Sequence, residues 1–284
     1  MAQETPYVVK ANGKKEPFDI LKLEHSLRNA DATPDTLQKI TKHIIQELED
    51  GMTTQDIYKH AFSLLHNIER RSALKYSMRR AVMDLGPSGF PFERLVAEIF
   101  KQKGYEAVTD KIVEGSCSDH EVDVVAWKPD SLIMCEAKFH GQLGLKSDLK
   151  TILYVKARFD DLSKKTYTFG AEPQPLSEGW LVTNTKFTIT AIKYAECQGM
   201  KAIGWNYPLD GNLHDLIDST GLHPLTCLHS LSDHDKKELL SKNIILCKNL
   251  VEDPSILVGL GLNDANIEAV LEEIALVGEM GIGA

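Results

Sequence analysis

The sequence predicts a multidomain protein: a mainly helical N-terminal domain, an α/β core with a mixed sheet, and a small all-helical C-terminal domain. Three observations lead to this fold class. At 284 residues the chain is longer than one typical domain. Helical and strand-like stretches alternate only in its middle. A breaker, LGPSG over residues 85–89, precedes that middle part. We place the domains at residues 1–86, 87–226 and 227–284.

The N-terminal domain is expected to begin with a short strand over residues 7–10 and a turn over residues 11–13. Apolar residues at helical spacing follow, at Ile20, Leu23, Leu27 and Ala30. A later helix should begin after Thr53, because TTQD over residues 53–56 has side chains typical of an N-cap and precedes an amphipathic stretch.

The two remaining domains have different patterns. In the central domain we expect helices near residues 92–100, 145–162 and 188–198, and strands at 105–108, 121–127, 132–138, 179–183 and 201–205. The C-terminal domain has helical candidates at residues 233–240, 254–258 and 265–276, joined by glycine-containing turns.

Composition narrows the class of protein. A hydrophobic content of 43% and a charged content of 26% are ordinary for a globular protein, while the net charge of −9 argues against a broad basic coat for nucleic acid. A local basic groove remains compatible with that charge. The five cysteines form no CxxC pair, and no apolar run is long enough to span a membrane. We therefore expect a cytoplasmic protein without membrane contact.

The segment from Glu121 to Lys138 has the most specific chemistry. Its two apolar strands, EVDVVAW and SLIMCEAK, are joined by a turn short enough for a hairpin. Side chains alternate along a strand, so Glu136 and Lys138 share a face, and Asp123 can face the same region from the neighbouring strand. Two carboxylates there can hold Mg²⁺, which activates water and polarises a phosphate, while the lysine stabilises developing charge.

The alternative is that these charges are solvated residues on the open face of a sheet, as isolated ExK tripeptides usually are. Here the charges interrupt runs that otherwise look buried, and a carboxylate in such a strand is costly unless it is paired or metal-bound. Glu93 adds to the pattern, since it flanks the apolar arc of its helix, whereas Arg94 and Glu98 lie on the wetter side.

These stretches, with FERLVAEIFKQKGYEAV and CEAKFH, resemble the catalytic core of Mrr-type restriction endonucleases of the PD-(D/E)xK superfamily and, more distantly, archaeal Holliday-junction resolvases. The later segment from Trp180 to Trp205 also resembles this family. The resemblance implies a DNA-cutting active site with Mg²⁺ or Mn²⁺ held by Asp123 and Glu136. Its catalytic residues would be Glu93, Asp123, Glu136 and Lys138.

The chain departs from the Mrr pattern in two places. The family usually has glycines and an aspartate before the strand aspartate, where this chain has SDHE over residues 118–121. It commonly has Gln at the position of Glu136, so this chain carries the fuller acidic form. The second difference favours activity, and the first leaves substrate contacts open.

The N-terminal sequences VVKANGKKEPFDILKLEHSL and TTQDIYKHAFSLL resemble the ATP-cone domain, which regulates ribonucleotide reductases. The resemblance implies ATP or dATP as a regulatory ligand. The phosphate-facing lysines would be Lys10 and Lys22, with Val9 and Glu16 near the nucleotide and Thr54 and Tyr58 at the base-side edge. One phosphate contact can be missing, because the family often has Lys-Arg where this chain has Lys10-Ala11. No Walker-type motif supports ATP hydrolysis.

The C-terminal domain loosely resembles a helix-hairpin-helix module, and a packing or oligomerising role, with a possible homo-oligomer, fits its acidic balance equally well. The leading hypothesis is a nucleotide-regulated, metal-dependent DNA endonuclease. One alternative is a non-catalytic ATP/dATP-sensing regulator that binds DNA. Another is a nuclease for branched DNA or RNA, since the same metal chemistry serves several nucleic acids.

Overall fold

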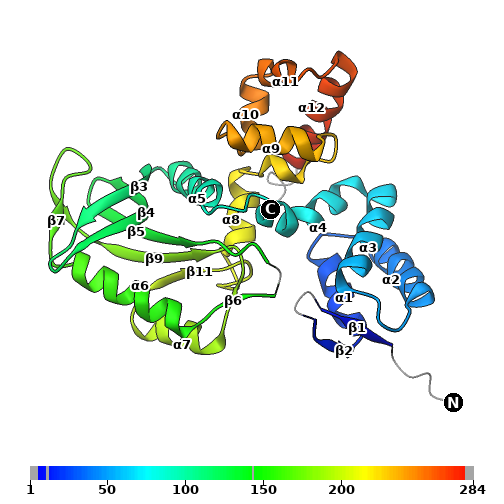
Figure 1. Cartoon of the computed structure of the whole chain (residues 1–284), viewed down its shortest axis with the longest axis horizontal. Helices are drawn as coiled ribbons and strands as arrows, with labels where there is room; N and C mark the ends of the chain where they lie inside the picture. The colour runs from blue at the N-terminus through cyan, green and yellow to red at the C-terminus, as the bar shows by residue number, and fades with distance from the viewer. Residues whose placement is uncertain (1–5, 11–12, 143, 279–284) are drawn as a thin grey trace.

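The computed structural model describes residues 6–10, 13–142 and 144–278; part of the turn expected at residues 11–13 lies outside this range. In Figure 1 the central sheet and the helices that cover it lie at the left, and the N-terminal helices lie at the right. The C-terminal helices α9 to α12 lie above the junction between them. The predicted fold class is confirmed: a helical N-terminal part, a core with a mixed sheet and a helical C-terminal part.

The N-terminal part is a bundle of four helices with a small hairpin at one end. Its elements are β1 (Tyr7–Val9), β2 (Lys15–Pro17), α1 (Ile20–Arg28), α2 (Pro34–Glu47), α3 (Thr54–Ile68) and α4 (Arg70–Met83). The helices begin at local caps. The Thr53 side chain accepts a hydrogen bond from the Asp56 amide, as the sequence predicts, and the Asp19 side chain accepts one from the Leu21 amide. Buried Leu27 and Leu65 anchor the core between the helices.

The central sheet has the order β11-β9-β5-β4-β3. Its strands are β3 (Glu106–Glu114), β4 (Asp119–Lys128), β5 (Ser131–Lys138), β9 (Glu178–Thr183) and β11 (Lys201–Ile203). Pairing is antiparallel from β3 through β4 to β5 and parallel from β5 through β9 to β11, so β5 is the central strand of a mixed sheet. Two-stranded ribbons are formed by β6 (Lys146–Ser147) with β10 (Lys186–Phe187), and by β7 (Thr166–Tyr167) with β8 (Gln174–Pro175).

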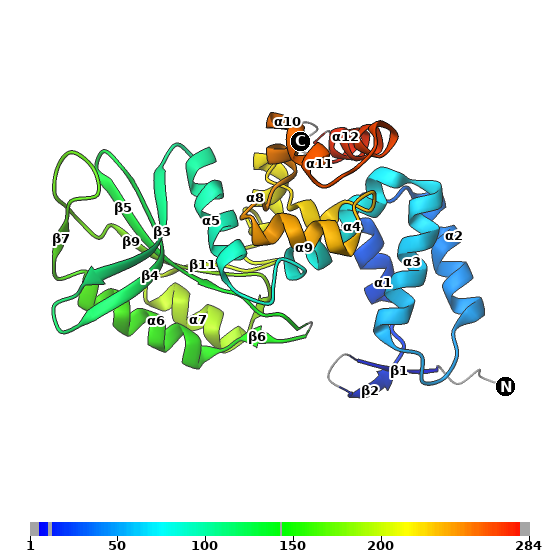
Figure 2. The same cartoon turned by 45° about the horizontal axis from the view of Figure 1, so that its top comes forward.

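Helices cover both faces of this sheet (Figures 1 and 2). Helix α5 (Phe90–Gln102) lies on one face, and α6 (Leu149–Leu162) and α7 (Ile189–Cys197) lie on the other. Along β5, Cys135 and Ala137 contribute to the core under α5, whereas Leu132 and Met134 contribute to the core under α6. This alternation supplies each face with its own apolar layer.

The C-terminal helices pack on both other domains. They are α9 (Asp233–Ser241), α10 (Cys247–Glu252), α11 (Ser255–Gly259) and α12 (Asp264–Gly278), preceded by α8 (Leu213–Thr220) and the short 3₁₀ helix η1 (Leu225–Cys227). One apolar core continues from α4 and α5 to α12. The Thr226 hydroxyl donates to the Ala81 carbonyl at 2.6 Å, and Lys248 forms an ion pair with Glu98 at 2.8 Å. Glu98, expected on the wet side of its helix, therefore contacts the C-terminal domain.

Several local expectations differ from the structure. The helix expected from residue 145 begins at Leu149, because Asp148 caps it and residues 146–147 pair with β10. The strand expected at residues 105–108 extends to Glu114 along β4. Helices α8 and α10 are short, and the sequence pattern does not predict them. No helix among the described residues is long and apolar enough to span a membrane.

Gly179 marks the closest approach of α6 to the sheet, and this generates a stability prediction. A Cβ at Gly179 would lie 2.3 Å from Cδ2 of the Phe159 ring. Gly179→Ala should lower the free energy of unfolding by about 1–3 kcal/mol, the usual cost of overpacking. Gly259→Ala is the matched control, since its Cβ would meet nothing within 4 Å. Urea unfolding of both full-length variants tests this, and equal midpoints for Gly179→Ala and wild type would contradict the packing described.

Candidate active site

The candidate site lies where β4 and β5 separate. Their antiparallel ladder runs from the Lys128–Ser131 pair to the Val124–Cys135 pair and ends there, immediately before Asp123 and Glu136. In place of the next ladder bond, the Ala137 amide donates to Oδ2 of Asp123 at 2.7 Å. A side-chain carboxylate thus takes the backbone partner that β4 leaves free. Asp123 and Glu136 are therefore not paired with each other, although Glu136 remains paired with Leu181 of β9.

The neighbouring strand β3 is irregular at the same level. Its ladder with β4 joins Thr109 to Val124 and Lys111 to Val122, which places Asp110 opposite Asp123. Asp110 has a φ of 56°, a left-handed conformation that aspartate tolerates better than most residues. The side-chain alternation also changes here, because Val122 and Val125 contribute to the same core. The local distortion of two adjacent strands therefore coincides with the carboxylates.

Glu93 reaches this region from the first turn of α5. Its carboxyl group forms a side-chain hydrogen bond with Asp110. Burial is the largest cause that raises the pKa of Glu93, and the negative charge of Asp123 adds to it; together they bring that pKa to about 8. Glu93 therefore retains a proton near neutral pH.

Glu136 has a cationic partner on the face of the sheet that α6 covers, away from α5 and Glu93. The Arg158 guanidinium, from α6, forms an ion pair with Glu136, and both side chains are less than one-fifth exposed. Arg158 is itself fixed, because it donates to the Glu121 carbonyl and to the Tyr154 hydroxyl, each at 2.9 Å. Burial and the charge of Asp123 nevertheless raise the pKa of Glu136 to about 7, against the opposing effects of Arg158 and Lys138.

Asp123 is partly buried between these groups. Burial raises its pKa, and the hydrogen bond from the Ala137 amide and the charge of Arg158 partly oppose that rise. Asp123 in turn raises the pKa of both Glu93 and Glu136. Three carboxyl groups thus interact electrostatically at the end of one pair of strands, which is the arrangement by which proteins perturb pKa values at functional sites.

Lys138 is exposed at the carboxyl end of β5, and the backbone beside it is firmly held. The Lys138 carbonyl accepts a hydrogen bond from the buried Thr183 hydroxyl at 2.8 Å. Two residues further on, the His140 amide donates to the Asn184 side chain at 2.8 Å, and the same side chain donates back to the His140 carbonyl at 2.9 Å. These bonds between β5 and β9 fix the backbone from which Lys138 projects.

The donor groups suit a divalent cation. Asp123 and Glu136 are oxygen ligands of the kind that Mg²⁺ and Mn²⁺ prefer. Burial, the largest cause of their raised pKa values, disfavours their charged forms, and a bound cation would stabilise those forms. In the part of the chain that the structure describes, three carboxylates of this site do not gather within 4.8 Å of one another. The Arg158 guanidinium neutralises part of the negative charge of Glu136.

Sequence reasoning missed two residues of this site, Asp110 and Arg158. An aspartate in a strand that otherwise carries Val108 and Val113 toward the core is a weak signal that could have indicated Asp110. Arg158 offers no comparable signal, because its contact with Glu136 depends on how α6 packs across the sheet.

In the N-terminal domain, the lysines expected to face phosphate converge on one carboxylate. Glu16 forms ion pairs with Lys10 at 2.7 Å and with Lys22 at 3.1 Å. These contacts, led by the hydrogen bond from Lys10, lower the pKa of Glu16. Glu16 therefore holds the two lysines together in the absence of a polyanion.

The other predicted nucleotide-contacting residues lie along the same end of the domain. Val9 bridges to Thr53, so β1 lies beside the start of α3, where Thr54 is exposed. Tyr58 lies one turn further along α3 and stacks on Tyr76 of α4, with ring centroids 5.1 Å apart. Burial raises the pKa of Tyr58 to about 12.

Comparison with known families agrees with this arrangement. Residues 6–81 match the family model of the ATP cone domain, residues 87–205 that of a restriction endonuclease of the Mrr type, and residues 223–277 that of the AF1548-like C-terminal domain. The resemblances seen in the sequence are thereby confirmed: a restriction endonuclease-like domain follows an ATP cone.

A curated relative covers much of the chain. An uncharacterized protein of Archaeoglobus fulgidus is 34% identical over 186 residues, which are 64% of this chain and all of that protein. The crystal structure of the protein of unknown function AF1548 is 32% identical, with a TM-score of 0.52, over 69% of this chain and all of that one. The chain belongs to the AF1548-like family.

Two other solved structures are more distant. Protein VC1899 from Vibrio cholerae is 16% identical with a TM-score of 0.29, over 65% of this chain and 48% of that one. The MspJI restriction endonuclease in complex with a 27-mer oligonucleotide is 14% identical with a TM-score of 0.28, over 66% of this chain and 44% of that one. At these TM-scores neither likeness bears on function.

The raised pKa of Glu93 predicts a pH-dependent cost to stability. Because the folded-state pKa of about 8 exceeds the ordinary value of 4.5, the folded state binds more protons between these pH values, and its stability falls as pH rises. Glu93→Gln should be as stable as wild type below pH 4.5 and increasingly more stable up to about pH 8. We expect a gain of about 1 kcal/mol, after allowance for solvent screening of a half-buried group.

Thermal unfolding of the two proteins from pH 4 to pH 9, without divalent ions, measures this difference. Glu106→Gln, at an exposed glutamate of β3, is the control and should follow wild type throughout. A constant offset between Glu93→Gln and wild type across that range would contradict the proposed origin of the pKa shift.

Proposed function

We propose that this protein is a nucleotide-regulated, metal-dependent DNA endonuclease that hydrolyses phosphodiester bonds. The observation that carries the proposal is that the charge of Asp123 contributes to the raised pKa values of both Glu93 and Glu136 at the point where β4 and β5 separate in a restriction endonuclease-like domain. Carboxylates in a strand are costly to bury, and this cost is recovered when they bind a cation.

In this proposal Asp123 and Glu136 hold Mg²⁺ or Mn²⁺. When bound, the metal polarises the scissile phosphate and lowers the pKa of a water molecule. Lys138, beside this pair, orients the attacking water or stabilises the charge that develops on the phosphate. Glu93, whose raised pKa keeps it protonated near neutral pH, can exchange that proton with the water or the leaving oxygen.

Arg158 has a distinct part in the proposal. Its ion pair with Glu136 keeps that carboxylate oriented and partly neutralised before a metal binds. The guanidinium is also fixed to the Glu121 carbonyl, so it stays close when Glu136 changes partner. Arg158 is then available as a cation beside the phosphate.

Basic side chains at the ribbon of β6 and β10 support a DNA contact despite the net charge of −9. Lys146 and Lys186 are register partners in β6 and β10, and Arg79 comes from α4 of the ATP cone. Burial, followed by the charges of Arg79 and Lys146, lowers the pKa of Lys186. Within the described ranges none of the three has an acidic ion-pair partner, so we assign them to DNA phosphates.

The nuclease proposal predicts loss of metal-dependent cleavage in conservative variants. Asp123→Asn, Glu136→Gln and Lys138→Ala should each reduce the cleavage rate by about 10²–10³, the scale of losing one group that stabilises the transition state. The assay uses Mg²⁺ or Mn²⁺ with linear, modified and branched DNA and with RNA, and circular dichroism verifies the fold of each variant.

Asp130→Asn is the matched control, because Asp130 lies in the exposed hairpin turn with a φ of 65°, which asparagine also tolerates. Equal product from wild type and Asp123→Asn would overturn the active-site assignment. Nucleotide-dependent DNA binding with no cleavage product would instead favour the non-catalytic regulator. Cleavage confined to branched DNA or RNA would change the substrate and keep the chemistry.

For regulation, we propose that ATP or dATP binds the cone with its phosphates on Lys10 and Lys22, replacing the Glu16 carboxylate as their anionic partner. Val9 and Thr54 would line the nucleotide beside these lysines, and Tyr58 would contact the base side. The link to the nuclease is α4, because Leu74 and Met78 share a core with α5.

Lys22→Ala and Lys10→Ala should each weaken ATP and dATP binding about tenfold to a hundredfold, since a charge-assisted hydrogen bond contributes about 1.5–3 kcal/mol. Isothermal titration of the full chain measures this loss. Lys39→Ala, on α2, is a control of equal charge change and should bind like wild type. Nucleotide affinity that is unchanged in both test variants would refute this placement of the phosphates.

A further inference from the structure

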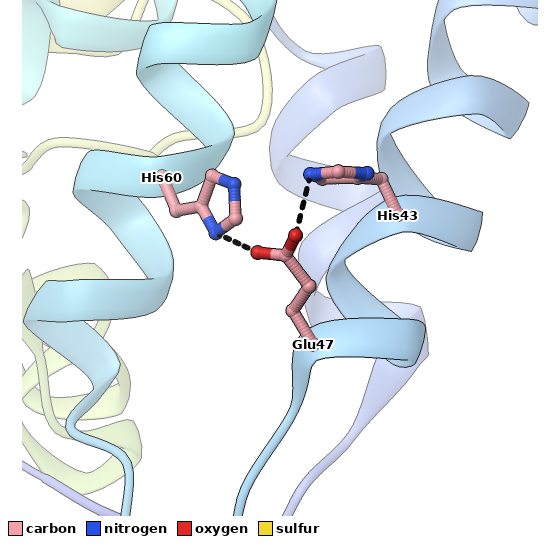
Figure 3. Close-up of side chains that lie close together, drawn as sticks. All are labelled: His43, Glu47 and His60. Carbon is pink, nitrogen blue, oxygen red and sulfur yellow. Dashed lines mark ion pairs between the residues drawn. The ribbon is translucent and has the colours of Figure 1, made fainter.

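A second cluster of metal-ligating side chains lies in the ATP cone, away from the candidate active site. His43 and Glu47 project from α2 one turn apart, and His60 projects from α3 (Figure 3). One ligand atom from each of the three residues lies within 4.8 Å of the others, and in the described part of the chain no other trio of His, Cys, Asp or Glu meets this condition.

The contacts within this cluster aim two ring nitrogens at one carboxylate. Nε2 of His43 lies 3.2 Å from Oε1 of Glu47, and Nδ1 of His60 lies 3.3 Å from Oε2 of the same group. Two ligands of a tetrahedral ion at about 2.0–2.1 Å are separated by roughly 3.3–3.4 Å, and each of the two contacts is close to that separation. The contacts use different oxygens of Glu47, so an ion held by both imidazoles would bind one oxygen after a turn of the carboxylate, or both oxygens together. The two imidazole rings are nearly perpendicular, at 86°, which lets both nitrogens face Glu47 without the rings colliding.

A comparison within the chain separates this cluster from ordinary His–carboxylate contacts. Asp218 also has two histidine neighbours, but Lys75 forms an ion pair with it at 3.4 Å and supplies a positive charge. Glu47 has no lysine or arginine partner among the residues described. Within the described part of the chain its carboxylate therefore faces two imidazoles and no lysine or arginine, and a divalent cation would complete the charge balance.

We propose that His43, Glu47 and His60 form a zinc-type site that clamps α2 to α3. Two imidazoles and one carboxylate favour Zn²⁺ over Mg²⁺, which prefers oxygen ligands alone. All three side chains are between 30% and 51% exposed, so water can fill the fourth position. Binding requires a lone pair on His43 Nε2 and His60 Nδ1, so each ring places its proton on its other nitrogen or releases it.

Because only unprotonated imidazole nitrogens bind the ion, affinity should fall as the solution becomes acidic. The clamp joins the last turn of α2 to the second turn of α3, the helix that begins at Thr54. The site requires neither nuclease activity nor nucleotide binding, so it stands or fails separately from the proposed function.

The test is equilibrium dialysis of the full chain against Zn²⁺ in the presence of excess Mg²⁺. The background carries Asp123→Asn and Glu136→Gln to remove the candidate active site, and Cys117→Ser and Cys197→Ser to remove the exposed thiols. We expect one Zn²⁺ per chain, bound at least tenfold more weakly after His43→Ala, His60→Ala or Glu47→Gln. Even outer-sphere partners of a metal ligand typically contribute this much to affinity.

His234→Ala is the matched control. His234 and Glu238 have the same i,i+4 spacing on α9, 3.9 Å apart, but among the described residues no third ligand atom lies within 4.8 Å of both. This variant should bind Zn²⁺ like the background. No stoichiometric Zn²⁺, or an equal loss in His234→Ala and His43→Ala, would overturn the proposal.

A second measurement covers the possibility that a variant is destabilised. Zn²⁺ should raise the melting temperature of the background protein and of His234→Ala, because an ion that binds only the folded state stabilises it. It should leave the melting temperatures of His43→Ala and His60→Ala unchanged, whatever their values without metal. A rise of equal size in all variants would contradict a site at these residues.

Discussion

The hydrogen bond from the Ala137 amide to the Asp123 carboxylate is the interaction on which the candidate site depends. It replaces a ladder bond at the place where β4 and β5 separate, and so leaves no backbone donor of β5 unpaired as the strands diverge. The separation is possible because β5 remains paired along its other edge with β9, through to Lys138 and Thr183. A central strand can release one neighbour at its end when the other neighbour holds it. The mixed topology of the sheet, antiparallel on one side and parallel on the other, is therefore the condition for the site.

The electrostatics of the site oppose folding. Burial and the charges of neighbouring carboxylates raise the pKa values of Glu93, Asp123 and Glu136, and each shift means that the charged carboxylate is less stable in the folded protein than in water. Arg158 offsets part of this cost at Glu136. The ATP cone uses the same device with the signs reversed, since Glu16 holds Lys10 and Lys22 together. In both places a side chain of opposite charge pairs with the groups that we assign to a ligand: Arg158 pairs with Glu136, and Glu16 pairs with the two lysines.

The sequence predicts much of this architecture because the relevant signals are local. Alternation along SLIMCEAK places Glu136 and Lys138 together, and the cap at Thr53 gives the start of α3. Glu93 is predicted mainly from the family resemblance, with its position on the edge of the apolar arc of α5 as a supporting signal. Asp110 has only a weak sequence signal, because its role arises from a left-handed backbone opposite Asp123. Arg158 and His60 escape prediction, since their partners, Glu136 and Glu47, come from other elements that only tertiary packing brings near.

Helix α4 belongs to two cores at once. Ala73 packs with the cone, while Leu74, Met78, Ala81 and Val82 pack with the nuclease and C-terminal helices. Lys75 extends this double attachment with ion pairs to Asp31 on the cone side and Asp218 on α8. Close-packed interiors switch between discrete arrangements and do not deform continuously, so neither core can absorb a tilt of α4 alone. A change at one end of this helix would accordingly shift the populations of a few conformations of the whole molecule. The cone would then favour one of these conformations over the others, and would not move as a hinged arm.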